Sequence, residues 1–110
     1  MNAIRQDVET LVQKELESAN EKFPSTFRNR YEAYGVMLEE FEEAQDELLK
    51  CQLYLNEFKY SMKVNGDYLE KENLNKLKER SENLMAEAGQ LAAMAQKSLN
   101  SMEEWNKDGI

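Results

Sequence analysis

The spacing of hydrophobic and polar positions along the 110-residue chain predicts three long helices. Between residues 2 and 22, apolar side chains recur at steps of three and four residues, which is the period of a helix with one apolar face. A second helix is expected over about residues 27–62, and a third over about 68–105, with a break near Arg80 that would divide it in two. The sequence therefore predicts an all-α protein, an antiparallel helical bundle of three to four long helices.

Two short segments separate the expected helices. Pro24 disfavours helical conformation in the residue before it, and Ser25 or Thr26 is expected to cap the second helix. Asn65 and Gly66 supply the positive-φ positions that a tight reversal needs. The chain is therefore expected to turn back on itself between the second and third helices.

The second helix carries an acidic face and a separate apolar face. At ~100° per residue, the acidic residues share a sector about 100° wide, and the apolar ones occupy another. The acidic residues are Glu32, Glu39, Glu40, Glu43 and Glu47, and the apolar ones are Tyr34, Leu38, Phe41 and Leu48. Like charges at this spacing repel by a few tenths of a kcal/mol per pair. Water and salt offset that repulsion in most acidic helices, and a hard divalent cation such as Mg²⁺ is the alternative.

Small residues in two places predict close packing between helices. The stretch 86–95 is rich in alanine and glycine, so we expect it at the centre of the bundle, with Glu87 and Gln90 turned toward another helix or a site. Buried carboxylates are retained when they are paired or bound to metal. Gly35, inside the second helix, costs ~1 kcal/mol relative to alanine, and close approach of a neighbouring helix or a ligand would compensate.

Composition narrows the class of protein. Charged residues make up 33% of the chain and hydrophobic residues 41%, with one proline and four glycines, which is typical of a single helical domain over residues 1–110. The formal charge of -8 argues against a nucleic-acid polymer as partner, because binding such a polymer needs clustered cations. A free nucleotide remains compatible with an acidic site through a bound metal ion.

The absence of histidine excludes Ser-His and Cys-His catalysis and histidine-ligated zinc. Cys51 is the only cysteine, so no intramolecular disulfide forms and we expect an ordinary packing residue. With no recognisable signal peptide, the chain is expected to be cytoplasmic. No apolar run approaches ~20 residues, so no membrane span is expected.

Two segments resemble the MazG-like all-α nucleoside triphosphate pyrophosphohydrolases. They are Tyr-Glu-Ala-Tyr-Gly-Val-Met-Leu-Glu-Glu-Phe-Glu-Glu-Ala and Glu-Ala-Gly-Gln-Leu-Ala-Ala-Met-Ala-Gln-Lys, within residues 27–45 and 84–99. The Leu-Ala-Ala-Met-Ala run is similar to phage and phage-derived members. The resemblance implies a homodimer or homotetramer with its site near the subunit interface. It also implies Mg²⁺-dependent hydrolysis of a nucleoside triphosphate to a monophosphate and pyrophosphate.

The resemblance also implies site residues. Glu39, Glu40 and Glu43 match the family's Glu-Glu-x-x-Glu motif, and Glu87 opens its Glu-x-x-Asp motif, so these four are the expected metal ligands and catalytic residues. Gln90 replaces the aspartate; its carbonyl oxygen can still bind Mg²⁺, but it has no charge and cannot act as a base. The interval between the two motifs is longer than is usual in the family.

Lys97 follows Gln90 by seven residues, which places it nearly on the same face of the third helix. In that position it is expected either to contact a phosphate of the nucleotide or to be a surface lysine.

Three interpretations remain at this point. The first is a Mg²⁺-dependent pyrophosphohydrolase. The second is a catalytically inactive helical oligomer of the same fold, acting as a binding or scaffold protein after the loss of the aspartate. The third is an acidic coiled-coil protein without the family fold.

Overall fold

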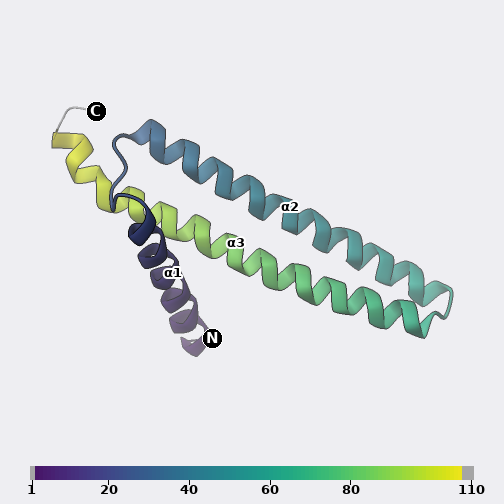
Figure 1. Ribbon diagram of the computed structural model, residues 1–110. Coiled ribbons are helices and arrows are strands. Elements are labelled where there is room, and N and C mark those ends of the chain that lie inside the picture. The colour runs from purple at the N-terminus through teal and green to yellow at the C-terminus, as the bar shows by residue number, and fades with distance from the viewer. Residues whose placement is uncertain (1, 108–110) are drawn as a thin grey trace. The chain divides into compact units, whose positions relative to one another are not determined.

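The structure, a computed structural model, describes residues 2–107, and its regular elements are helices (Figure 1). These are α1 (Asn2–Lys22), α2 (Arg30–Lys63) and α3 (Asp67–Lys107). This part of the chain contains no strand, which confirms the all-α prediction. The break expected near Arg80 does not occur, because α3 is continuous over 41 residues. None of the helices in residues 2–107 combines the length and apolar character that crossing a membrane requires.

The chain divides into two compact units, which are described separately. The first unit combines the residues up to Phe41 with those from Ala88 onward, so it contains α1, the beginning of α2 and the second half of α3. The second unit runs from Glu42 to Glu87 and consists of the remaining parts of α2 and α3. Both long helices therefore contribute to both units.

The core of the first unit takes residues from α1, the loop after it, α2 and α3. Buried hydrophobic residues form one cluster: Leu16, Phe27, Ala33, Ala93, Met94 and Trp105. The partly buried Val12, Ala19, Val36 and Met37 pack against this cluster. Leu11 of α1 lies against Gly89 of α3, where an added Cβ would meet the leucine side chain at 3.5 Å. Small side chains on α3 thus accommodate α1.

The loop between α1 and α2 is fixed to α3 through the backbone of Phe27. Its N–H donates to Ser101 Oγ (2.9 Å), and its carbonyl accepts from Trp105 Nε1 (2.8 Å). Ser101 Oγ in turn donates to the carbonyl of Lys97 (2.7 Å). All of these groups are buried, so both backbone groups of Phe27 are satisfied without regular secondary structure.

The position of Trp105 near the end of the sequence predicts a frayed helix end, but the structure places this residue in the core. Its side chain is only 6% exposed, because the indole packs into the core and its N–H reaches the carbonyl of Phe27. The sequence also predicts fraying of the tail Lys107–Ile110, of which residues 108–110 lie outside the described residues.

The expectation that Ser25 or Thr26 caps the second helix is wrong. Asn29 caps α2, since its Oδ1 accepts the backbone N–H of Glu32 at 2.9 Å. The helix therefore begins three residues later than predicted. The physical reason is the bonding of Phe27, whose backbone N–H and carbonyl are already engaged by α3.

In the second unit, α2 and α3 run antiparallel and are joined by a tight turn (Figure 1). Gly66 N–H donates to the carbonyl of Ser61 (3.0 Å), and Asn65 N–H to that of Met62 (3.4 Å), the two bonds of a Schellman motif. Asn65 adopts a φ of 52°, as expected, whereas Gly66 does not have a positive φ. An added Cβ at Gly66 would lie 3.3 Å from Leu69, so close packing is the constraint there.

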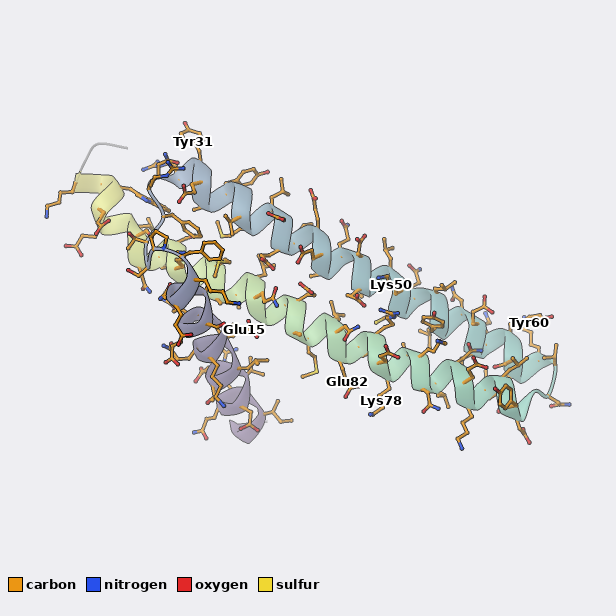
Figure 2. All side chains as sticks on the ribbon, viewed as in Figure 1. Glu15, Tyr31, Lys50, Tyr60, Lys78 and Glu82 are labelled. Carbon is orange, nitrogen blue, oxygen red and sulfur yellow. The ribbon has the colours of Figure 1, made fainter. Side chains whose placement is uncertain are left out.

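The seam between the two helices of the second unit is partly polar. On α2 the half-buried residues recur at steps of three and four: Ala44, Glu47, Cys51, Tyr54 and Phe58. Glu47 Oε1 lies 3.5 Å from Lys50 Nζ and 3.7 Å from Arg80 Nη1. Cys51 Sγ lies 3.7 Å from Ser81 Oγ, in line with a packing role. By contrast, Lys78 and Glu82 project from the outer side of α3 (Figure 2).

The apolar row of α2 is exposed, and part of its acidic face is half-buried. In the second unit, Glu47 is 14% exposed on the inner side, whereas the adjacent Leu48 is 56% exposed. Leu55 and Met62 follow Leu48 at intervals of seven residues and are also exposed. In the first unit, Tyr34 and Phe41 of the same row are exposed. Three residues of the acidic face, Glu32, Glu40 and Glu47, are therefore half-buried, whereas Glu39 and Glu43 of the same face are exposed like the apolar row.

Two packing expectations need correction. Gly35 is exposed, and an added Cβ would meet nothing within 4 Å, so no helix approaches it in the described residues. Within the small-residue stretch, Gly89 and Ala93 are buried, but Ala92 and Ala95 are exposed. Only one side of that stretch therefore packs as expected, because its small residues are distributed around α3.

Replacement of Ser101 with alanine is expected to destabilise the protein by about 1–3 kcal/mol, because the buried N–H of Phe27 loses its acceptor. Ser98→Ala is the matched control. Ser98 Oγ makes the same bond to a carbonyl four residues earlier, but accepts no backbone N–H. Urea denaturation measures both variants, and equal losses would contradict the role given to the Phe27 contact.

Candidate functional site

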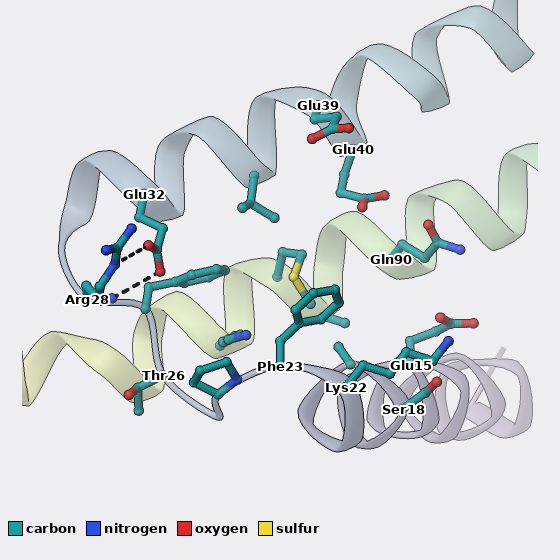
Figure 3. A pocket seen from close by; sticks show the side chains of 17 residues that line it. Glu15, Ser18, Lys22, Phe23, Thr26, Arg28, Glu32, Glu39, Glu40 and Gln90 are labelled. Carbon is teal, nitrogen blue, oxygen red and sulfur yellow. Dashed lines mark hydrogen bonds and ion pairs between the residues drawn. The ribbon is translucent and has the colours of Figure 1, made fainter.

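A cavity of about 660 Å³ lies within the first unit, between the end of α1, the following loop, the beginning of α2 and the second half of α3 (Figure 3). Part of its wall is apolar and includes Phe23, Pro24, Val36 and Met94. The rest carries charged and amide side chains: Glu15, Lys22, Arg28, Glu32, Glu39, Glu40, Gln90 and Lys97. An amphipathic ligand with charged groups fits such a lining better than a purely apolar one.

Arg28 and Glu32 form an ion pair at the beginning of α2, across the Asn29 cap. Arg28 Nε lies 2.6 Å from Glu32 Oε2, and the backbone N–H of Arg28 donates to Glu32 Oε1 at 3.2 Å. The side-chain hydrogen bond from Arg28, supported by that backbone bond, holds the pKa of Glu32 below its ordinary value. Glu32 is therefore an ionised carboxylate at neutral pH.

Lys97 of α3 is not a surface lysine. It is 4% exposed, lines the cavity and places its Nζ 4.5 Å from the centroid of the Phe27 ring. Burial lowers the pKa of Lys97, and the charge of Glu32 opposes this effect. The part of the chain that the structure describes contains an ion pair between Arg28 and Glu32, but none for Lys97. The ammonium group thus faces the cavity without a directly bonded carboxylate.

Three residues of the two sequence motifs line the cavity. Glu39 is exposed, and Glu40 and Gln90 are half-buried. Figure 3 shows Glu40 and Gln90 extending from α2 and α3 on the same side of the cavity. The cavity therefore has oxygen donors from both motifs as well as cations.

Glu43 and Glu87 belong to the second unit, where each offers a carboxylate oxygen within 4.8 Å of the other. Glu43 is exposed and Glu87 is half-buried. Glu40 precedes Glu43 by three residues on the continuous helix α2, so both project from the same side of that helix. Carboxylate oxygens are the ligands that Mg²⁺ prefers in proteins.

Sequence reasoning did not single out Arg28. Its available signal was the spacing of four residues from Glu32 at the beginning of a helix. Lys22 and Glu15 also line the cavity, and their sequence positions look like an ordinary polar helix face.

The chain matches no protein-family model, no curated protein sequence and no solved structure. The MazG-like resemblance therefore rests on the residues of the two motif segments.

Lys97→Met removes a buried charge, so we expect the variant to be as stable as the wild type at pH 7, or more stable by up to about 1 kcal/mol. Because the pKa of Lys97 is lower in the folded than in the unfolded chain, the unfolded chain binds more protons between the two values. Raising the pH through that window stabilises the wild type relative to the variant. The stability difference should therefore narrow as the pH approaches the ordinary lysine pKa of about 10.4.

Urea denaturation at neutral and alkaline pH measures that difference. Lys14→Met, at an exposed position of α1, controls for the loss of one positive charge. Two outcomes would contradict a buried and charged Lys97. One is a stability difference between wild type and Lys97→Met that does not change with pH, and the other is an equal change with pH in Lys14→Met.

Proposed function

We propose that the protein is a Mg²⁺-dependent nucleoside triphosphate pyrophosphohydrolase of the MazG-like type, which converts a nucleoside triphosphate to a monophosphate and pyrophosphate. The observation that carries the proposal is the proximity of the carboxylates of Glu43 and Glu87. These residues come from the two motif segments, which are far apart in the sequence. Carboxylates so close together repel each other, and a bound cation would remove that repulsion.

The proposed ligands of the ion are Glu39, Glu40, Glu43 and Glu87, with the Gln90 carbonyl oxygen as a weaker one. Glu39 and Glu40 are supported by their position on α2, one turn before Glu43. When bound, Mg²⁺ neutralises phosphate charge and lowers the pKa of a bound water. The glutamates hold the ion and orient the attacking water, and Lys97 provides a positive charge for the phosphates.

Self-association is part of the proposal. We infer a homodimer or homotetramer that covers the exposed apolar row on α2. The support is the exposure of Leu48, Leu55 and Met62 in the second unit. A helix with an outward apolar face is typical of a helix covered by another chain.

The proposed activity predicts pyrophosphate release from at least one member of a panel of nucleoside triphosphates, dependent on Mg²⁺. Glu43→Gln is expected to lower the rate about 100-fold or more, because a lost stabilisation of roughly 3 kcal/mol corresponds to that factor. Glu42→Gln, one position earlier on the same helix, removes the same charge outside the proposed ligand set.

No Mg²⁺-dependent release from any nucleotide would contradict the proposal and favour the inactive binding or scaffold protein. Equal losses in Glu42→Gln and Glu43→Gln would show that overall charge, and not the ligand, is responsible.

Gln90→Asp is expected to strengthen Mg²⁺ binding about tenfold, because it adds an anionic ligand at the position that the resemblance assigns to aspartate. In the absence of metal, the added carboxylate should lower the melting temperature through repulsion, and Mg²⁺ should raise it more than in the wild type. Thermal denaturation over a Mg²⁺ titration measures both effects. Unchanged Mg²⁺ stabilisation in Gln90→Asp would remove Gln90 from the proposed ligands.

A further inference from the structure

One end of the cavity in the first unit brings two cations toward a single carboxylate. Arg28 is hydrogen-bonded to Glu32, and the charge of Lys97 acts on the same group. We propose that this end of the cavity is an oligophosphate subsite, in which Glu32 occupies the place of the ligand anion and competes with it. Identification of the ligand as a nucleotide's phosphate tail rests on the proposed function, but the subsite itself requires no metal.

Lys97 is the fixed part of this subsite. Lys97 is 4% exposed as a residue, and burial of an unpaired charge is costly. The ring of Phe27 offsets part of that cost at 4.5 Å, and no carboxylate is bonded to Lys97 among residues 4–107. An anion entering the cavity would supply the missing partner.

Arg28 is the cation of this subsite whose side chain can change its partner. Its side chain is 86% exposed, and its Nε bonds Glu32. A guanidinium has five N–H donors in a planar arrangement and commonly binds phosphate through two of them. Arg28 can therefore exchange Glu32 for a phosphate at little cost in rearrangement.

Glu32 acts as an internal anion. It lines the same cavity as both cations, and its pKa is held down first by Arg28 and to a smaller extent by Lys97. At this end of the cavity one carboxylate faces two cations, whereas Lys22 lies beside Glu15 on α1 (Figure 3). A ligand with several negative oxygens spread along its length matches this arrangement better than a single carboxylate does.

The polarity of the cavity gives the orientation of the ligand. Gln90 and Lys97 are seven residues apart on α3, about 10 Å along the helix axis. Figure 3 shows Glu39, Glu40 and Gln90 at one end of the cavity and Arg28 and Glu32, on which the charge of Lys97 acts, at the other. Without metal, a phosphate chain would thus lie at the end with the cations rather than against the carboxylates of the acidic motif.

The test is isothermal titration calorimetry of inorganic triphosphate into the full chain, with EDTA present and at physiological salt. Glu32→Gln is expected to bind about five- to tenfold more tightly than the wild type, since it removes the competing charge and keeps the shape. Lys97→Met is expected to bind about tenfold more weakly. Glu21→Gln, an exposed position of α1 outside the cavity lining, controls for net charge and should bind like the wild type.

Tighter binding by Glu32→Gln cannot result from misfolding, so the experiment remains decisive if Lys97→Met fails to fold. No binding by either the wild type or Glu32→Gln would overturn the proposal, as would equal gains in Glu32→Gln and Glu21→Gln. Citrate is titrated in parallel, and equal affinity for citrate would overturn the assignment to oligophosphate. Metal-free binding in a protein that releases no pyrophosphate would leave this subsite standing while the hydrolase proposal fails.

Discussion

The hydrogen bonding of the Phe27 backbone is the constraint on which the first unit depends. A buried amide and carbonyl in an irregular loop need partners, and Ser101 and Trp105 of α3 supply them. The same contact sets where α2 can begin and puts an aromatic ring over the ammonium of Lys97. The charged end of the cavity is therefore a product of how the loop is held, and not of the helices alone.

Two half-buried carboxylates of α2 are paired with cations. In the first unit Glu32 is met by Arg28, and in the second Glu47 is met by Arg80 and Lys50. Partly buried carboxylates are stable in the folded state when cations compensate them.

Periodicity and turn residues were sufficient to predict the three helices, because both signals are local. The surroundings of individual side chains were harder to predict from the sequence, because they depend on residues far away in the chain. Nothing near Trp105 indicates that its indole reaches a carbonyl 78 residues earlier, and Lys97 is buried by an aromatic ring from another element. Gly35 has the same local signal whether its surroundings are packed or open. Of the site, Glu39, Glu40, Gln90 and Lys97 were anticipated as residues, but their common cavity with Arg28 depends on tertiary contacts.

The sequence separation of these contacts has a consequence for the order of folding. The turn of the second unit is closed by a bond between Gly66 and Ser61, only five positions apart, whereas the bonds of Phe27 span 74 and 78 residues. Loop-closure entropy makes such distant pairings slower to form than local ones. During synthesis on the ribosome, the turn between α2 and α3 can therefore form as it emerges. The bonds of Phe27, which follow α1, cannot form until Trp105 has been synthesised.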